Sequence, residues 1–240
     1  MSANVEGCTA LVTGGNRGIG RAFVEELVSL GAAKVYCGAR EPDSVPVELT
    51  RTGAVPVELD VTDDASVSAT ASRCPDVNVL INNAGLHGRD HLVFADDPDM
   101  ARAEMEVNYF GVLRMIRAFA PALAASGGGA IVNVVSVAGM FPTGSMGGYS
   151  PAKAAAYFLS IIARGELVRQ DTSVTALSVG RVDTRMSDFL PDGKIHPREI
   201  AVAGLKAMAR GERVCDTDFG AIQARARYTL DPVRWERGMA

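Results

Sequence analysis

The 240-residue sequence has little lysine and no long apolar run, and both features bear on which partners the protein can bind. It holds 4 Lys against 20 Arg, and its 28 acidic residues give a net charge of −4. No overall basic field would therefore attract nucleic acid. No apolar stretch approaches the roughly 20 residues that a membrane-spanning helix requires. We expect neither nucleic acid nor a membrane as a partner.

Cysteine is also scarce, with Cys8, Cys37, Cys74 and Cys215 scattered singly. Four cysteines could form two disulfides, but without a Cys-x-x-Cys pair they are more simply buried thiols of a reducing compartment. The first residues lack the basic segment and apolar core of a secretion signal. We therefore expect a cytoplasmic protein.

Short β-rich runs alternate with longer helical stretches. Strands are predicted at residues 9–13, 34–37, 54–59, 77–81, 130–135, 174–179 and 213–215, and helices at 19–30, 63–72, 100–125 (broken by Pro121) and 149–169. Strands that are apolar on both faces and separated by helices indicate a doubly wound parallel α/β sheet. No linker or repeat divides the chain, so we predict one domain over residues 1–240, with a less regular C-terminal segment from about 211 to 240.

A glycine-rich turn, TGGNRGIG at residues 13–20, joins the first predicted strand to the first helix. Gly14 permits a sharp turn, Gly18 permits close approach of a pyrophosphate, and Gly20 permits tight packing of helix on sheet. The amides of the helix N-terminus carry partial positive charge towards such phosphates. Glycines also serve ordinary turns, but the flanking strand and helix favour a dinucleotide site.

The second predicted strand ends at Arg40, where a site that prefers NAD would place an acid near the ribose hydroxyls. Arg17 lies within the glycine turn. Two guanidinium groups suit the 2′-phosphate of NADP, although both could be solvated loop residues. Glu41 could still reach the ribose, so the sequence favours NADP(H) over NAD(H) without excluding the latter.

The segment YSPAK opens the predicted helix at 149–169 and places Tyr149 and Lys153 on one helix face. An ammonium beside a phenol is expected to lower the pKa of the phenol, as proton transfer near neutral pH requires. Ser136 ends the strand at 130–135, at the sheet edge where the glycine turn also lies. A surface Tyr–Lys pair and a capping serine are the alternatives.

Taken together, these segments resemble the short-chain dehydrogenase/reductases in their one-domain form, over about residues 8–185. The matching motifs are TGGNRGIG at 13–20, Asp60-Val61-Thr62, Asn82-Asn83-Ala84-Gly85, Asn108 in VNYFG, Ser136 in NVVSVAG, and Tyr149 with Lys153 in YSPAK. The resemblance implies a single-domain Rossmann fold of about seven strands.

The resemblance also implies four catalytic roles. Tyr149 would be the general acid when a carbonyl is reduced and the base when an alcohol is oxidised. Lys153 would lower the pKa of Tyr149 and bind the nicotinamide ribose. Ser136 would polarise the substrate oxygen, and Asn108 would hold a water that links Lys153 to solvent.

For the cofactor, the resemblance implies that Asp60 binds the adenine amino group, that Val61 supplies a backbone contact, and that Asn82 and Gly85 line the adenosine ribose. The full set of expected cofactor-binding residues is Gly14, Asn16, Arg17, Gly18, Ile19, Arg40, Asp60, Val61, Asn82, Ala84, Gly85, Tyr149, Lys153, Gly180, Val182 and Thr184. No metal site is expected.

One departure follows the strand at 174–179, where the family usually has proline and this chain has Val179. Losing proline frees φ and restores an N–H donor. Nicotinamide contacts through Val182 and Thr184 stay plausible. Arg181 could meet an anionic substrate or face solvent, and solvent is the favoured interpretation. A short substrate lid should follow at about 185–197, with Met186, Phe189 and Leu190 towards the pocket.

Two further features have plain and functional interpretations. His87 and His91 are four residues apart, but Gly88 and a loop setting argue against a metal pair, and His87 is expected to border the substrate cleft. The apolar face Ala156, Leu159, Ile162 and Ala163 could be core, or could pair with a second copy as in relatives, giving a homodimer or homotetramer.

We therefore predict an NADP(H)-dependent oxidoreductase that acts on the carbonyl or secondary alcohol of a small molecule, as a ketoreductase. Two alternatives stay open: an isomerase or dehydratase that works through a transient ketone, and an NADP-binding sensor without turnover. A sensor needs no proton relay, so the set Asn108, Ser136, Tyr149 and Lys153 argues against it.

Overall fold

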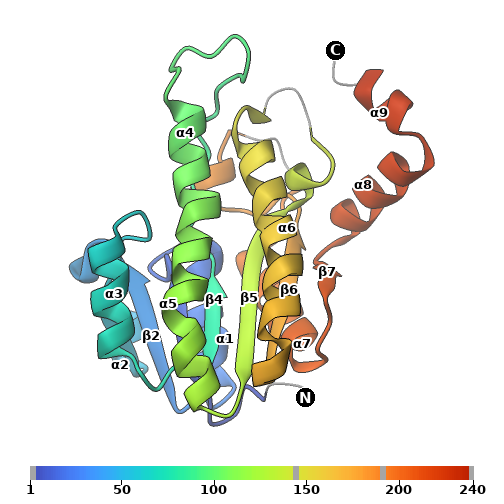
Figure 1. Ribbon diagram of the computed structural model, residues 1–240. Coiled ribbons are helices and arrows are strands. Elements are labelled where there is room, and N and C mark those ends of the chain that lie inside the picture. The colour runs from blue at the N-terminus through green and yellow to red at the C-terminus, as the bar shows by residue number, and fades with distance from the viewer. Residues whose placement is uncertain (1–3, 143–145, 190–192, 238–240) are drawn as a thin grey trace.

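The computed structural model describes residues 4–142, 146–189 and 193–237, and its centre is a seven-stranded parallel sheet (Figure 1). The strands are β1 (Thr9–Thr13), β2 (Lys34–Ala39), β3 (Ala54–Glu58), β4 (Val79–Asn82), β5 (Gly129–Ser136), β6 (Thr172–Val179) and β7 (Val214–Asp216). Their order is β3-β2-β1-β4-β5-β6-β7, and every pairing is parallel. The predicted doubly wound sheet is confirmed, with its switch point between β1 and β4.

Helices cover both faces of the sheet. They are α1 (Gly18–Ser29), α2 (Val47–Arg51), α3 (Asp64–Arg73), α4 (Met100–Met105), α5 (Gly111–Ala125), α6 (Tyr149–Leu167), α7 (Pro197–Ala209), α8 (Phe219–Leu230) and α9 (Pro232–Arg237). Figure 1 shows α3, α5 and α6 in front of the sheet, α1 and α7 behind it, and α8 and α9 projecting beyond β7. None of the helices in the described ranges is both long and apolar enough to cross a bilayer.

The two main hydrophobic cores, one on each face of the sheet, result from the alternation of side chains along each strand. Leu80 and Ile131 belong to the core under α5 and α6, whereas their neighbours Ile81 and Val132 belong to the core under α1 and α7. All four side chains are fully buried. Successive residues of a strand point to opposite faces, so a sheet covered on both sides needs continuous apolar runs.

The long helix predicted at 100–125 is continuous through Pro121, so the predicted break there is wrong. Pro121 lies within α5 on its exposed side. The missing N–H leaves only the carbonyl of Arg117 without its helical donor, and Arg117 faces water, which can replace it. The irregularity lies instead in a π-helical turn at Glu106–Phe110, between α4 and α5.

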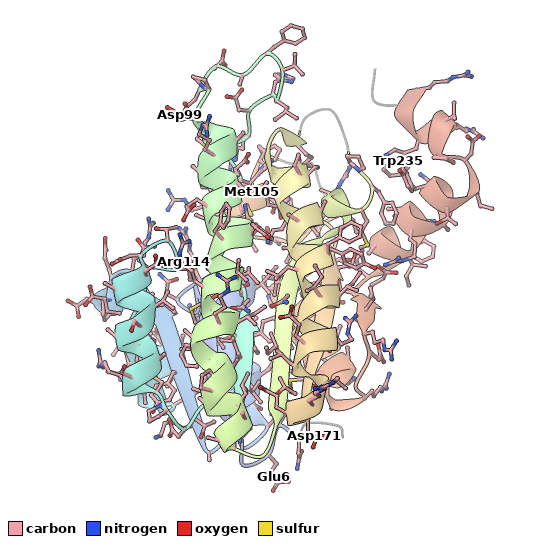
Figure 2. The ribbon with its side chains drawn as sticks, in the orientation of Figure 1. Glu6, Asp99, Met105, Arg114, Asp171 and Trp235 are labelled. Atoms are coloured by element: carbon pink, nitrogen blue, oxygen red, sulfur yellow. The ribbon has the colours of Figure 1, made fainter. Side chains whose placement is uncertain are left out.

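The carboxyl ends of the strands lie at the top of the molecule in Figure 1, where the loops after β4, β5 and β6 also gather. Figure 2 places Asp99 in the loop above α4 and Met105 near the upper end of the long front helix. In an open parallel sheet, ligands bind beyond this edge at the switch point. The predicted site residues should therefore meet here.

Candidate active site

The glycine-rich turn has the backbone geometry that its sequence predicts. Gly14 and Gly18 have φ of 63° and 55°, in the left-handed region that favours glycine. A Cβ on Gly20 would lie 2.1 Å from the carbonyl oxygen of Gly14, so α1 packs this closely on the turn only because position 20 has no side chain. The turn thus leads directly from β1 into α1.

The N-terminus of α1 is open to an anion. Its N-cap, Arg17, is in an extended conformation and provides no side-chain cap. Asn16 instead donates from Nδ2 to Ser44 Oγ at 2.9 Å, which ties the turn to the segment after β2. Uncapped first-turn amides together with the helix dipole form a phosphate site.

Arg17 and Arg40 are both exposed at this end of the sheet, and neither forms an ion pair with any residue in the described parts of the chain. Arg40 lies near enough to Asp60 to affect its titration. Burial raises the pKa of Asp60, but hydrogen bonds from Thr62 and the charge of Arg40 outweigh burial and hold that pKa below its ordinary value. Asp60 is therefore an ionised acceptor at the adenine end of the expected groove.

Asn83, which the sequence analysis did not select, holds β1 and β4 together at the switch point. The N–H groups of Asn83 and Ala84 both donate to Thr13 Oγ at 2.9 Å. The side-chain amide of Asn83 donates to the carbonyl of Thr13 at 2.9 Å and to that of Gly14 at 3.2 Å. By contrast, Asn82 turns its amide into the interior and donates to Asn133 at 2.8 Å. Only the backbone of Asn82 therefore faces the edge.

Asn108 lies in the π-helical turn and is completely buried. Its Nδ2 donates to the carbonyl of Leu86 at 2.7 Å, and the N–H of Leu86 donates back to its Oδ1 at 3.2 Å. A Cβ on Gly85 would lie 3.1 Å from Asn108 Oδ1 and 3.6 Å from Lys153 Nζ. The absence of a side chain at Gly85 lets the loop after β4, the π turn and α6 meet at one point.

Lys153 is only 4% exposed and donates from Nζ to the carbonyl of Val134 at 2.9 Å. Its ammonium lies 5.7 Å from the centroid of the Tyr149 ring. Burial lowers the pKa of Lys153 to about 8. A buried ammonium costs solvation free energy, and among the residues that the structure describes one carbonyl compensates for it.

The pKa of Tyr149 does not follow the prediction. Burial raises it to about 12; hydrogen bonding with Ser136 lowers it in part, and the charge of Glu104 raises it further. The expected lowering of this pKa by Lys153 is thus wrong for the protein by itself. The physical reason is that desolvation of the phenolate dominates and the ammonium is directed to Val134. At neutral pH Tyr149 is a protonated donor.

Ser136 lies at the end of β5 beside the end of β6. Its Oγ accepts from the N–H of Ala138 at 3.2 Å and donates to the carbonyl of Val179 at 3.4 Å. Ser136 therefore caps the turn after β5, which was the alternative interpretation from the sequence. It also places its hydroxyl beside Tyr149. Ser136, Tyr149, Lys153 and Asn108 come from three segments and meet at one edge.

The turn after β6 approaches the glycine turn. A Cβ on Gly18 would lie 3.3 Å from Thr184 Cγ2, so these two segments face each other across the expected groove. The N–H of Gly180 donates to Asp218 Oδ2 at 3.1 Å, a support from the N-cap of α8 that the sequence analysis missed. Val182 is buried and bridges to Ile195, while Arg181 is exposed as predicted.

The described part of the predicted lid segment contacts the loop after β4. The His87 ring lies 4.8 Å from that of Tyr149 and 5.7 Å from that of Phe189, so His87 lies between the predicted proton donor and the lid segment. Arg89, with φ of 61°, donates to the carbonyl of Arg185 at 2.9 Å and pairs with Asp188 at 2.7 Å. Leu190, also predicted to face the pocket, lies outside the described residues.

The C-terminal helices support the loop that precedes Tyr149. Trp235, labelled in Figure 2, donates from Nε1 to the carbonyl of Pro142 at 2.8 Å. The ring of Tyr228 lies 5.2 Å from that of Phe141. Arg225 bonds to Asp216 at 2.6 Å. Helices α8 and α9, which the sequence did not specify, thus pack against Phe141 and Pro142, between β5 and α6.

Comparisons with known proteins agree with this geometry. The family model for short chain dehydrogenases matches residues 8–194. The structure is similar to the crystal structure of a short chain dehydrogenase from Burkholderia cenocepacia J2315 in complex with NADP, with a TM-score of 0.93, 40% identity and 98% of each chain covered.

Curated relatives of similar length point the same way. The 3-oxoacyl-(acyl-carrier-protein) reductase FabG of Vibrio harveyi is 32% identical over 83% of this chain and 89% of its own. Sorbitol dehydrogenase of Cereibacter sphaeroides is 35% identical over 87% of each. The chain spans only 39% of the length of short chain dehydrogenase tazN from Aspergillus terreus, to which it is 34% identical.

Proposed function

The chain belongs to the short-chain dehydrogenase family, and from that premise we propose that it is an NADP(H)-dependent ketoreductase acting on a small-molecule carbonyl or secondary alcohol. The observation that carries the proposal is the meeting of Ser136, Tyr149, Lys153 and Asn108 beside the glycine-rich turn. A hydroxyl, a phenol and a buried amine on this edge are what reversible proton transfer to a carbonyl oxygen requires.

The residues along the expected groove have the geometry and chemistry to bind a dinucleotide. The open N-terminus of α1 would hold the pyrophosphate, Asp60 the adenine, and Thr184 with Lys153 the nicotinamide end. When bound, the nicotinamide supplies or accepts the hydride.

The protein's part is to move a proton and to orient the substrate oxygen. Tyr149 donates its phenolic proton to the carbonyl oxygen, and Ser136 donates a hydrogen bond to that same oxygen. The raised pKa of Tyr149 keeps the proton in place at neutral pH, which suits reduction more than oxidation. Lys153 and Asn108 lie behind Tyr149, where they can return the proton through water.

The preference for NADP(H) over NAD(H) rests on Arg17 and Arg40. Both guanidinium groups are exposed and have no carboxylate partner in the described residues, so both can bind a 2′-phosphate. The Burkholderia cenocepacia relative was solved with NADP. Glu41 is exposed beside Arg40 and is the one residue that favours NAD(H).

The assay that tests the function is loss of NADPH absorbance with a panel of ketones, aldehydes and imines, including β-keto thioesters and sugar ketones. The names of the two curated relatives justify the last two classes. Net NADPH oxidation with at least one carbonyl is the expected result. Product formed without net oxidation would support the isomerase or dehydratase, and NADPH binding without any product would support the sensor.

We also propose that the protein works as a homodimer or homotetramer. On α6, Ala156, Leu159 and Ala163 are core residues, but Phe158 and Ile162 stay 63% and 57% exposed. Such apolar exposure on a regular helix suits pairing with a second copy. Light scattering of the wild-type protein and of Ile162→Glu tests it: a mass of 25.2 kDa for the wild type would contradict the assembly.

A further inference from the structure

A carboxylate lies buried beside the proton donor, and the mechanism above does not use it. Glu104, in α4, is 2% exposed although a helix residue at this depth is ordinarily apolar. No Lys or Arg within the described ranges forms an ion pair with it. Burying such a group costs free energy unless its hydrogen bonds compensate, so its partners matter.

Two backbone segments contact the carboxylate, one in the loop after β4 and one at the start of α6. Glu104 Oε1 accepts from the N–H of Gly88 at 2.7 Å, in the loop after β4 that holds His87. The N–H of Gly148, the residue immediately before Tyr149, lies close enough to the carboxylate to lower its pKa. A Cβ on Gly148 would lie 2.6 Å from Ala101 Cα and 2.7 Å from Glu104 Oε2, so α4 and its carboxylate approach the start of α6 this closely only because position 148 has no side chain.

Glu104 also supports Asn108, because the carbonyl of Glu104 accepts from Asn108 Nδ2 at 2.9 Å. The same two loops touch again one residue away: a Cβ on Gly147 would lie 2.4 Å from the carbonyl oxygen of Asp90. One residue thus connects the π turn, the loop after β4 and the start of α6.

Burial raises the pKa of Glu104 above its ordinary value, and the charge of Asp90 adds to the rise. The N–H groups of Gly88 and Gly148 favour the ionised form and offset part of that rise. A negative charge here opposes ionisation of the neighbouring phenol.

We propose that Glu104 is a positioning residue for the proton donor: its carboxylate fixes the cleft through Gly88 and Gly148, and its charge holds Tyr149 as the protonated phenol. The proposal rests on the assignment of Tyr149 as that donor. During reduction of a carbonyl, such a charge keeps the phenolic proton on Tyr149. In the direction of oxidation, it delays formation of the base to higher pH.

The groups that face Tyr149 and Glu104 define what else can contribute. Ser136 from β5, Lys153 on α6 and His87 from the loop after β4 surround the phenol, and Asp90 faces the carboxylate. Burial and the charge of Glu104 oppose the phenolate, whereas Ser136 favours it. Removing the charge of Glu104 alone therefore predicts a lower pKa for Tyr149.

The test is ionisation of Tyr149 followed by NMR of the whole protein labelled at the tyrosine Cζ. The chain has 5 Tyr, and Tyr149→Phe identifies the resonance. A charge change this close shifts a pKa by about one unit. At pH 11, about one-tenth of Tyr149 should be phenolate in the wild type and about half in Glu104→Gln. Circular dichroism at each pH records that the fold is intact.

Glu106→Gln is the matched control. It makes the same chemical change two residues further along, where the side chain pairs with Arg114 at 2.6 Å instead of facing the cleft. In Glu106→Gln, Tyr149 should titrate as it does in the wild type. Glu104→Asp, which keeps the charge, should also leave the Tyr149 curve near its original position and serves if Glu104→Gln does not fold.

Kinetics give a second readout. With any carbonyl that proves active, Glu104→Gln should displace the pH profile of alcohol oxidation to lower pH by about one unit, with unchanged affinity for NADPH. A Tyr149 titration in Glu104→Gln that overlays the wild-type curve would overturn the proposal. It would leave the reductase assignment intact, whereas a wild type inactive on every carbonyl would remove that assignment and leave the NMR result standing.

Discussion

The two halves of the sheet's carboxyl edge are built in different ways. Over β1 to β3, the turn at residues 13–20 and the Asp60–Thr62 contact are made by residues close together in the chain. Over β5 to β7, Arg89 bonds to a residue 96 positions away, Trp235 to one 93 positions away and Gly180 to one 38 positions away. Apart from the Asn16–Ser44 bond, 28 positions apart, and the Asn83–Thr13 bonds, 70 positions apart, the nucleotide half is held by local contacts, whereas the substrate half is assembled from distant segments.

This difference shows where the protein can vary its chemistry. A phosphate site needs only a turn and the amides that follow it, so its geometry is fixed within one short segment. The substrate side depends on three loops and two terminal helices, each held by a few polar contacts. Substitutions in one half should therefore leave the other half intact.

Tyr149→Phe should show the largest difference between an effect on the substrate half and an effect on the nucleotide half. The phenol supplies the proton, so its loss should lower kcat by about a thousandfold. The affinity for NADPH, measured by fluorescence titration, should stay within about twofold, because the variant keeps the ring. Tyr157→Phe on the same helix is the control and should be near wild type. Retained turnover in Tyr149→Phe would remove Tyr149 from the mechanism.

Lys153→Met should raise the free energy of unfolding. This would show that burying the Lys153 ammonium in the substrate half destabilises the wild-type fold. The folded pKa of about 8 lies below the ordinary 10.5, so the unfolded chain binds more protons between these values. The penalty is complete below pH 8 and disappears as pH rises to about 10.5. At pH 7 the variant should gain about 2–3 kcal/mol in free energy of unfolding.

Urea unfolding of both proteins from pH 6 to pH 10.5 measures this gain. The difference between them should shrink as pH rises, since other titrating groups cancel. A constant difference, or one that grows with pH, would show that Lys153 is not buried as a charge. Loss of the bond to Val134 sets the lower end of the expected gain.

Arg40→Glu tests the nucleotide half alone. Replacing a guanidinium by a carboxylate should weaken NADPH about tenfold relative to NADH, because one charge-assisted contact to the 2′-phosphate is lost. Arg51→Glu, exposed at the end of α2, controls for net charge. Equal weakening of both nucleotides, measured by calorimetry, would contradict the assignment of Arg40.

Arg89→Asn should have the smallest effect, confined to the substrate half. Asparagine tolerates the left-handed backbone at this position, so the change removes the lid contacts without strain. The ion pair with Asp188 is largely exposed and contributes little by itself. KM for the carbonyl should rise about threefold at unchanged NADPH affinity. Arg102→Asn, on the exposed side of α4, is the control.

The sequence predicted the sheet well because its cause is local. Continuous apolar runs such as residues 130–135 are required wherever both faces are covered, and β1 matches its predicted range residue for residue. The break predicted at Pro121 failed because one missing hydrogen bond on a solvated face does not end a helix. Helices α8 and α9 carry no strong pattern, since few of their side chains are buried.

For the site, residue identities were predictable but their electrostatics were not. The motifs located Ser136, Tyr149 and Lys153, yet spacing alone cannot show that desolvation outweighs the ammonium. Asn83 lay within a recognised motif, and its contacts with Thr13 follow once β1 and β4 are known to be neighbours. Glu104 and Asp218 gave no signal, because their partners are backbone amides in other loops.

The position of β1 between β2 and β4 has a consequence for how the fold is held together. The crevice at this junction exists only when both βαβ halves of the sheet have docked, so the unfolded chain offers a nucleotide nothing comparable. Saturation at a hundred times the dissociation constant would add about 2.7 kcal/mol to the free energy of unfolding. A bound dinucleotide therefore stabilises the junction between the two halves of the sheet, and the melting temperature should rise with the dinucleotide concentration.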